Sequence, residues 1–370
     1  MCHPTCGLEI NLRRFKANRR VRVLTMTEVA GITGQRGDYQ VTLRIRPRYV
    51  NENCTACGDC AAAVSAEIPN PYNYGINQIK AAYLPYAMAY PQRYVLDPSI
   101  IGTADADQAK AACKVGAIDL EMQDETVQLA VGAVVWATGW KPYDATKIQP
   151  YGYGRFPNVI TSVEFERLAD PSGPTSGKLL RPSDGKAAKN IAFIQCAGSR
   201  DENHLRHCSR ICCMATLKQT QYVREALGEE AQSTVYYIDI RSIDRLEDFY
   251  QMVQRDTTVK FIKSKVARIA QADNGDPILH GVDTEGYHRY ATAYDLVVLA
   301  IGMEPESNAI TLPEDVMTDS SGFIEGSSDG GMCGAGSASS PLDVNRSAQS
   351  ATSAALRAMK VIHQTAREEA

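Results

Sequence analysis

Four cysteines near the middle of the chain, Cys196, Cys208, Cys212 and Cys213, form a C-x11-C-x3-C-C pattern. The first ends an apolar, strand-like run over residues 190–195, and the last two open a helix-like stretch over residues 212–226. Because α/β proteins build sites where strands end and helices begin, the pattern predicts four thiolates at one site. Such ligands favour soft metals and iron–sulfur clusters, whereas adjacent cysteines do not suit the spaced pairs of tetrahedral zinc sites. Four buried or idle thiols are the structural alternative.

A second cysteine pattern lies earlier in the chain. Cys54, Cys57 and Cys60 are spaced C-x2-C-x2-C, like the opening of a bacterial ferredoxin motif, but Val64 stands where the fourth cysteine belongs. In ferredoxins with two clusters, the fourth cysteine of each run binds the other cluster. The second run here keeps only that last cysteine, Cys113. One complete ligand set survives, which predicts one 4Fe-4S cluster on these four cysteines, with zinc on the same thiolates as the alternative.

The composition favours an intracellular metal-binding protein. The formal net charge of −4 does not indicate a nucleic-acid partner. The chain has no apolar run near the ~18 residues of a spanning helix, and its first residues lack the pattern of a signal peptide. The cysteine count is eleven, which is odd, and eight of these cysteines fall into the two sets. Metal binding in a reducing compartment, the cytoplasm, fits better than disulfides.

Alternating strand-like and helix-like segments predict a parallel sheet in the second half of the chain. The strands are expected at residues 190–195, 233–240 and 259–270, with helices at 212–226 and 246–253 between them. In the first half, strands are expected at residues 20–29 and 39–50, joined by a hairpin turn at Gly31, Gly34 and Gly37.

Two apolar strands end at glycine and are followed by proline, at Gly139 and at Gly302, and a glycine-rich segment (330–343) precedes a helix-like C-terminal stretch. These features resemble flavoproteins with two dinucleotide-binding domains, the thioredoxin-reductase-like group. The segments Cys-Ala-Gly-Ser-Arg-Asp, Cys-Ser-Arg-Ile-Cys-Cys, Asn-Tyr-Gly-Ile-Asn from Asn73 and Lys-Ala-Ala-Tyr-Leu-Pro from Lys80 narrow the resemblance. Over essentially its whole length the chain resembles the A subunit of heterodisulfide reductase. It is most similar to the bacterial forms, in the quinone-interacting membrane-bound oxidoreductase and in sulfur oxidation.

The resemblance implies an α/β, thioredoxin-reductase-like fold with an inserted ferredoxin-like module. Residues 1–50, 116–145 and 293–370 would form the FAD domain, residues 51–115 the insert, and residues 146–292 a second Rossmann-like domain carrying the cysteine-rich motif. The family's first FAD-binding βα unit, whose G-x-G-x-x-G loop holds the pyrophosphate, is missing, so the FAD domain is N-terminally incomplete. We therefore expect the chain as given to bind FAD poorly.

The resemblance also implies the site residues and the function. The residues expected to contact FAD are Thr138, Gly139, Gly302, Gly334, Gly336, Ser337 and Asp343. The family uses the positions matching Cys196, Cys208, Cys212 and Cys213 for an unusual 4Fe-4S cluster, which gives two clusters in all. The chain would relay electrons between FAD, the clusters and partner subunits, with membrane contact only through those partners. A homodimer is also compatible with the sequence.

Several alternatives stay open at this stage. A stand-alone pyridine-nucleotide disulfide oxidoreductase is one, although Cys-Ala-Gly-Ser stands where a nicotinamide domain needs G-x-G-x-x-G. A zinc-stabilised scaffold without redox chemistry is another. Arg200, Asp201 and His204 either tune the cluster by hydrogen bonding or cap a loop. The roles of Cys2, Cys6 and Cys333 are left open.

Overall fold

The computed structural model describes residues 6–368, which fall into two compact units. The first unit runs to Val131 apart from Gln35–Asp38, and the second holds Gln35–Asp38 and the chain from Gly132 onwards. The five-segment domain division stays a prediction. Among the described residues, no helix has both the length and the apolar character needed to cross a membrane.

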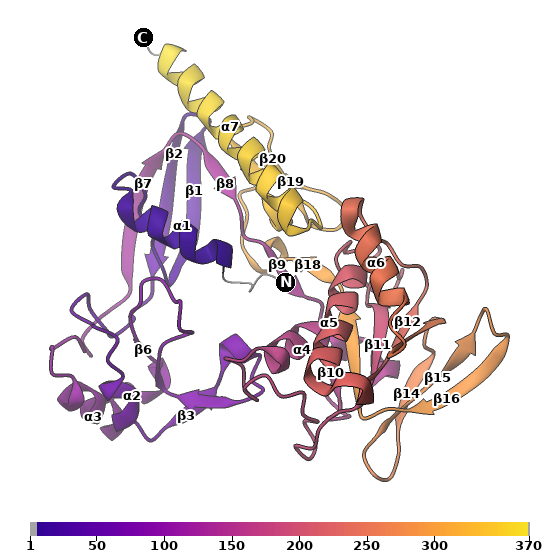
Figure 1. The fold of residues 1–370 in the computed structure, drawn as a ribbon. Helices are drawn as coiled ribbons and strands as arrows, with labels where there is room; N and C mark the ends of the chain where they lie inside the picture. Colours follow the sequence, from indigo (N-terminus) through magenta and orange to yellow (C-terminus); the bar gives the residue numbers. More distant parts are fainter. Residues whose placement is uncertain (1–5, 369–370) are drawn as a thin grey trace. The chain divides into compact units, whose positions relative to one another are not determined.

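The first unit contains a helix and a three-stranded antiparallel sheet. Its elements are α1 (Cys6–Ala17), β1 (Thr27–Gln35), β2 (Asp38–Ile45) and β7 (Glu125–Val131), with strand order β1-β2-β7 (Figure 1). The prediction of a strand from residue 20 is wrong: Met26 has a left-handed backbone (φ 56°), and the strand begins after it. The strand then continues through Gly31 and Gly34, and the chain reverses at Gly37 (φ 91°).

A small module lies between β2 and β7. It contains α2 (Asp59–Ala63), α3 (Ala104–Ala112) and two short hairpins, β3 (Glu67–Pro69) with β4 (Gln78–Lys80) and β5 (Ala82–Tyr83) with β6 (Val95–Leu96). The two helices pack against each other. Val50, Leu96, Ile100 and Ile118 form part of its buried core, so the module has an apolar centre of its own.

The second unit is built on a five-stranded parallel sheet. Its strands are β10 (Val159–Thr161), β17 (Leu296–Ile301), β11 (Asn190–Ala197), β12 (Gln232–Tyr237) and β13 (Val259–Lys263), in that spatial order. The helices are α4 (Ser162–Ala169), α5 (Cys212–Leu227) and α6 (Glu247–Gln254). The predicted β-α-β-α-β order is confirmed by β11, α5, β12, α6 and β13. The strand expected at 259–270 is divided into β13 and β14 (Arg268–Gln271), which belong to different sheets.

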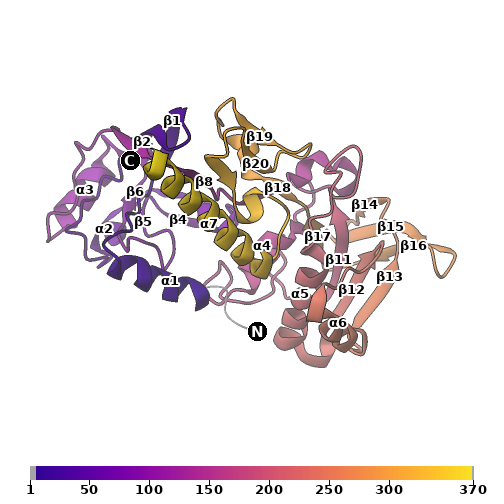
Figure 2. The same cartoon turned by 90° about the horizontal axis from the view of Figure 1, so that it is seen from above.

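Both faces of this sheet are covered, which explains why its strands are continuously apolar. Ile191 and Phe193 of β11 pack with Leu217 of α5 on one face. Ala192 and Ile194 pack on the other face, against the side that carries β14, β15 (Pro277–Asp283) and β16 (His288–Ala293). Figures 1 and 2 show α5 and α6 on the helical face and the antiparallel β14–β16 sheet beyond the opposite face.

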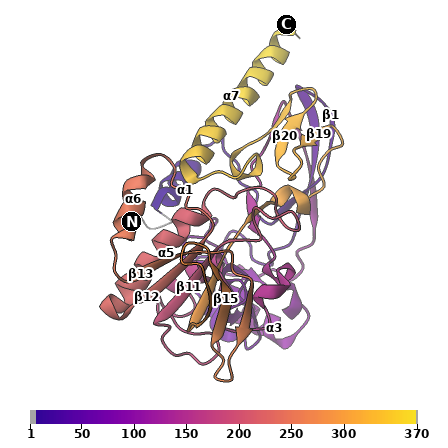
Figure 3. The same ribbon diagram turned by 90° about the vertical axis from the view of Figure 1, so that its right-hand side faces the viewer.

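The rest of the second unit consists of short strands and one long helix. Its elements are β8 (Val134–Trp136), β9 (Trp140–Pro142), β18 (Met303–Pro305), β19 (Val316–Thr318), β20 (Ile324–Ser327), β21 (Met332–Gly334) and α7 (Val344–Glu368; Figure 3). The strands form one sheet in the order β19-β20-β21-β8, in which β21 and β8 are parallel. The other two strands, β9 and β18, form a separate antiparallel pair.

We expect Asp256, at the end of α6, to contribute measurably to stability. Its carboxylate is buried and accepts hydrogen bonds from the Arg224 guanidinium (2.6 Å) and from the Thr258 hydroxyl (2.7 Å) and backbone amide (3.0 Å). Burial raises the pKa of Asp256, but these bonds outweigh it and hold the pKa at about 2. Since the folded pKa is depressed, the stabilisation is present above the unfolded pKa of about 4 and is lost as the pH falls through about 2.

Asp256→Asn should therefore lower the free energy of unfolding at pH 7 by about 2 kcal/mol. Urea unfolding at a series of pH values checks this, and the difference from the natural chain should shrink below about pH 4. Asp273→Asn, in an exposed turn, is the control. A deficit of equal size at pH 7 and pH 3 would contradict the electrostatic origin.

Candidate functional site

The structure brings Cys196, Cys212 and Cys213 to the carboxyl ends of three adjacent parallel strands. Cys196 lies next to the last residue of β11. The Cys212 sulfur lies 3.5 Å from the carbonyl oxygen of Ile301, the last residue of β17, and the Cys213 sulfur lies 3.8 Å from that of Asp239, just after β12. Because β11 is flanked by β17 and β12, the first helical turn of α5 spans this edge of the sheet.

The fourth cysteine of this set, Cys208, belongs to the same group. The pKa of Cys213 is raised to about 11, chiefly by burial and also by the thiolates of Cys196 and Cys208. The pKa of Cys212 is also raised, by burial and then by Cys196, Cys213 and Cys208. The four sulfurs therefore lie within electrostatic range of one another. Bare thiolates are unfavourable here, so a cationic metal core that stabilises them fits the donor set.

The backbone around these cysteines is locally strained. Cys196, Arg200 and Arg210 have left-handed conformations with φ of 56°, 56° and 64°, which are uncommon for residues other than glycine. The register of β11 against β17 shifts between Ile194 and Ala197. The Arg210 amide donates to the Cys208 sulfur at 3.4 Å. Strain of this kind gathers at functional sites.

The loop between β11 and α5 (residues 198–211, the cysteine loop) is hydrogen-bonded to the junction of β17 and β18. Ser209 Oγ accepts a hydrogen bond from the Met303 amide (2.8 Å) and lies 3.2 Å from Ser199 Oγ. The His207 ring nitrogen lies 2.9 Å from the Met303 carbonyl oxygen. A Cβ atom on Gly302 would overlap Ser199 Oγ. Gly302, predicted as a FAD contact, thus lies against the cysteine loop, and this close packing accounts for glycine at that position.

The three polar residues after Cys196 have different partners. Asp201 forms an ion pair with Lys265 at 2.8 Å, and His204 Nδ1 lies 2.8 Å from the Tyr143 hydroxyl. Arg200 instead forms an ion pair with Asp239, and its guanidinium interacts electrostatically with the Cys196 thiol. Of the three, Arg200 is placed to act on the cysteine site.

The other set, which consists of Cys54, Cys57, Cys60 and Cys113, lies in the module between β2 and β7. Cys54 and Cys60 flank a loop with left-handed residues at Ala56 (φ 57°) and Gly58 (φ 91°). The Ala56 amide donates to the Cys54 sulfur at 3.4 Å. The pKa of Cys60 is raised to about 11, chiefly by burial and also by Cys54 and Cys57. Cys57 itself is exposed.

Cys113 follows the last residue of α3, and its sulfur accepts a hydrogen bond from the Ala117 amide at 3.2 Å. Cys54, Cys60 and Cys113 all belong to one hydrophobic cluster of the module. Val64, in the place of the missing cysteine, is 2% exposed and packs in that cluster. The sequence did not identify Tyr94, whose hydroxyl lies 3.3 Å from the Cβ position of Gly58 and whose pKa is raised by burial and by Cys60, Cys57 and Cys54.

Within residues 6–368, no group of three or more His, Cys, Asp or Glu side chains could hold one metal ion. The ligands of a four-iron cluster differ in that each binds its own iron atom. They are therefore spread around the cluster rather than gathered at a single centre.

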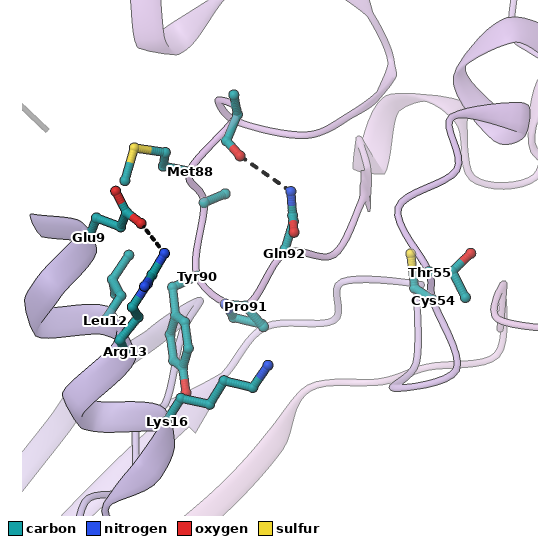
Figure 4. Close-up of a pocket in the computed structure, with 12 residues that line it drawn as sticks. Glu9, Leu12, Arg13, Lys16, Cys54, Thr55, Met88, Tyr90, Pro91 and Gln92 are labelled. Atoms are coloured by element: carbon teal, nitrogen blue, oxygen red, sulfur yellow. Dashed lines mark hydrogen bonds and ion pairs between the residues drawn. The ribbon is translucent and has the colours of Figure 1, made fainter.

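A cavity of about 720 Å³ opens beside Cys54 (Figure 4). Glu9, Arg13 and Lys16 of α1 line one side, and residues 87–92 line another. Glu9 and Arg13 are ion-paired across one helical turn. The sequence predicted neither α1 nor this cavity. Cys2 lies outside the described residues, and the side chain of Cys6 is also not described.

Four of the residues predicted to contact FAD lie at the carboxyl ends of the parallel pair β8–β21. Trp136 is in register with Gly334, so Thr138 and Gly139 leave β8 beside Gly334 and Gly336. The Trp136 Nε1 and Thr138 Oγ1 atoms are buried without a hydrogen-bond partner. Gly139 has φ 78°, and a Cβ atom there would meet nothing within 4 Å. Unsatisfied polar atoms next to open space fit a bound polar group.

The remaining predicted contacts lie just beyond this edge. Ser337 is in the short turn after Gly336, whose amide donates to Ser350 Oγ of α7 at 3.0 Å. Asp343 accepts the Arg346 amide at 2.9 Å and so caps the N-terminus of α7. Cys333 is buried against Ala354 of α7, in a packing position outside both cysteine sets.

No protein-family model matches the chain. Among curated proteins, it is 36% identical over 307 residues to the A subunit of the ferredoxin/F(420)H(2)-dependent CoB-CoM heterodisulfide reductase of Methanosarcina acetivorans, covering 82% of this chain and 38% of that protein. It is 40% identical over 291 residues to the iron–sulfur A subunit of the CoB–CoM heterodisulfide reductase of Methanocaldococcus jannaschii, covering 77% and 44%. The chain thus spans less than half the length of these two relatives.

Among solved structures, the chain resembles thioredoxin reductases at low similarity. That of T. acidophilum aligns with a TM-score of 0.40 and 14% identity over 66% of this chain and 69% of the other. That of Lactococcus lactis aligns with a TM-score of 0.41 and 12% identity over 77% and 86%. On the sequence matches to the curated proteins, the chain belongs to the family of heterodisulfide reductase A subunits.

Proposed function

We propose that this chain is an electron-transfer iron–sulfur flavoprotein subunit of a complex related to heterodisulfide reductase. The observation that carries the proposal is the convergence of Cys196, Cys212 and Cys213 at the ends of β11, β17 and β12, with Cys208 in electrostatic range. Its chemistry suits a 4Fe-4S cluster, because four clustered thiolates need a cationic core.

We propose a second 4Fe-4S cluster on Cys54, Cys57, Cys60 and Cys113. The shared hydrophobic cluster of three of these residues supports it, as do the amide donors to the Cys54 and Cys113 sulfurs. Hydrogen bonds of this type to cluster sulfurs raise the reduction potential, since they stabilise the added negative charge.

FAD is proposed at the β8–β21 edge. When bound, it would let the protein exchange electrons in pairs or singly. Trp136 Nε1 and Thr138 Oγ1 would donate to it, and Gly139 would leave room for it. The backbone of Gly334 is tightly held, since a Cβ there would overlap the Ile324 carbonyl oxygen.

The partners are proposed to be other subunits of the same complex. The curated relatives are named as subunits of reductases for the CoB–CoM heterodisulfide, and some names include ferredoxin. A substrate-reducing centre would then lie on a partner. The stand-alone disulfide reductase is the weaker alternative, because the relatives are named as subunits.

The visible spectrum of protein purified without oxygen tests the proposal. We expect a brown protein with a broad shoulder and iron equivalent to two four-iron clusters, together with acid-labile sulfide. A yellow protein with twin flavin peaks and no iron would contradict the cluster assignment. A colourless protein containing zinc would favour the structural alternative for both cysteine sets.

A further inference from the structure

We propose that Arg200 and Asp239 form an opposed pair that sets the reduction potential of the metal centre on Cys196, Cys208, Cys212 and Cys213. The inference rests on the proposed function, because it concerns the cluster assigned there. It deepens that proposal by naming the residues, outside the ligand set, that control how readily the site accepts an electron.

The position of Arg200 is held from three directions. Its backbone is left-handed (φ 56°), a conformation fixed by the Arg200 amide donating to the His207 carbonyl oxygen at 3.1 Å. Its guanidinium forms an ion pair with Asp239. The same guanidinium lies close enough to the Cys196 thiol for the two groups to interact electrostatically. The Arg200 side chain is about one quarter exposed, so its charge is only partly screened by water.

Asp239 approaches the site from the next strand. It follows β12, and its carbonyl oxygen lies 3.8 Å from the Cys213 sulfur. Its carboxylate faces both Arg200 and Arg241, whose Nε lies 3.5 Å away. The carboxylate therefore places a negative charge beside the ligand set and also orients the cation that opposes it.

The two residues should act with opposite signs. One-electron reduction adds a negative charge to the site, which a nearby cation stabilises and a nearby anion disfavours. Arg200 should therefore raise the potential. Asp239 lowers it directly, and it also neutralises part of the arginine charge.

Redox titration of the natural chain and its variants, followed by EPR, tests the pair. Arg200→Gln should lower the equilibrium constant for reduction about tenfold, because it removes one partly buried cation beside the site, or about 59 mV for a one-electron couple. Asp239→Asn should shift the potential in the opposite direction. Arg200→Lys should recover part of the loss, since it keeps the charge but not the planar fork.

Lys265→Gln is the matched control, because it removes a cation from the adjacent ion pair with Asp201. It should leave the potential unchanged, and the signal of the Cys54 centre should not move in any variant. Iron content distinguishes a failure of the proposed function from a failure of this inference. Natural protein without iron would overturn the proposed function itself. Full iron with an unchanged potential in Arg200→Gln, or shifts of the same sign in Arg200→Gln and Asp239→Asn, would overturn this inference alone. If Arg200→Gln fails to assemble the cluster, Arg200→Lys and Asp239→Asn must still shift the potential in opposite directions.

Discussion

Cys213→Ser should lose about half of the iron bound by the chain, and Cys212→Ser should do the same. Each removes one thiolate from the set, in which Cys213 is buried and the other three cysteines are partly buried. Adjacent helical residues diverge by about 100°, and the structure shows the result: the Cys212 sulfur lies beside Ile301 of β17, and the Cys213 sulfur lies beside Asp239, after β12. Neither cysteine can take the place of the other.

Iron and sulfide analysis with EPR of the reduced protein checks this result. The signal from the Cys196 set should disappear or change shape, whereas the signal from the Cys54 set should persist. Cys333→Ser is the control, because Cys333 is also buried but packs against α7. If both variants keep full iron and an unchanged spectrum, these cysteines are not ligands and the electron-transfer function loses its main support.

Cys113→Ala should abolish the centre in the module between β2 and β7 while leaving the other intact. Cys113 is the one ligand of its set that comes from the second cysteine run, at the end of α3. The α2–α3 packing and the shared hydrophobic cluster bring it to Cys54 and Cys60. Without it, the remaining three thiolates cannot complete a four-iron cluster.

Iron analysis and EPR check this result. The variant should lose the half of the iron that Cys212→Ser and Cys213→Ser keep. Val64→Cys is an informative comparison. It restores the missing ferredoxin cysteine at a buried position, but the other ligands of a second cluster are absent, so its iron content should equal that of the natural chain. A Cys113→Ala protein with full iron would show that a different residue completes the set.

The sequence predicted the centre of each unit better than its edges. The apolar run before Cys196 lies in β11, because a strand covered on both faces is continuously apolar. The helix-like stretch after Cys213 lies in α5, whose buried residues recur with the helical period. The strand predicted from residue 20 was wrong because alternation alone does not reveal a left-handed residue such as Met26. The helix α1 was not predicted, and its described side chains are mostly exposed, so it has little buried face to give a helical pattern.

At the candidate sites, the sequence identified residue types but not their directions. It grouped Arg200, Asp201 and His204 as equals, yet their side chains turn to Asp239, Lys265 and Tyr143. These partners are 39 to 64 positions away in sequence. Local patterns contain no information about such pairings, because Asp239 and Lys265 follow β12 and β13, and Tyr143 follows β9 of a different sheet.

The β9–β18 pair has a consequence for the spacing of the two candidate sites in the second unit. Its ladder joins Met303 to Pro142 and Pro305 to Trp140. At one end the Tyr143 amide bonds the Gly302 carbonyl oxygen beside the cysteine loop, and at the other the Glu306 amide bonds the Gly139 carbonyl oxygen. This ladder therefore sets the separation between the proposed metal site and the proposed FAD site. Because the rate of electron tunnelling falls steeply with distance, a rung added to or removed from this ladder would change the rate of exchange without touching a single ligand.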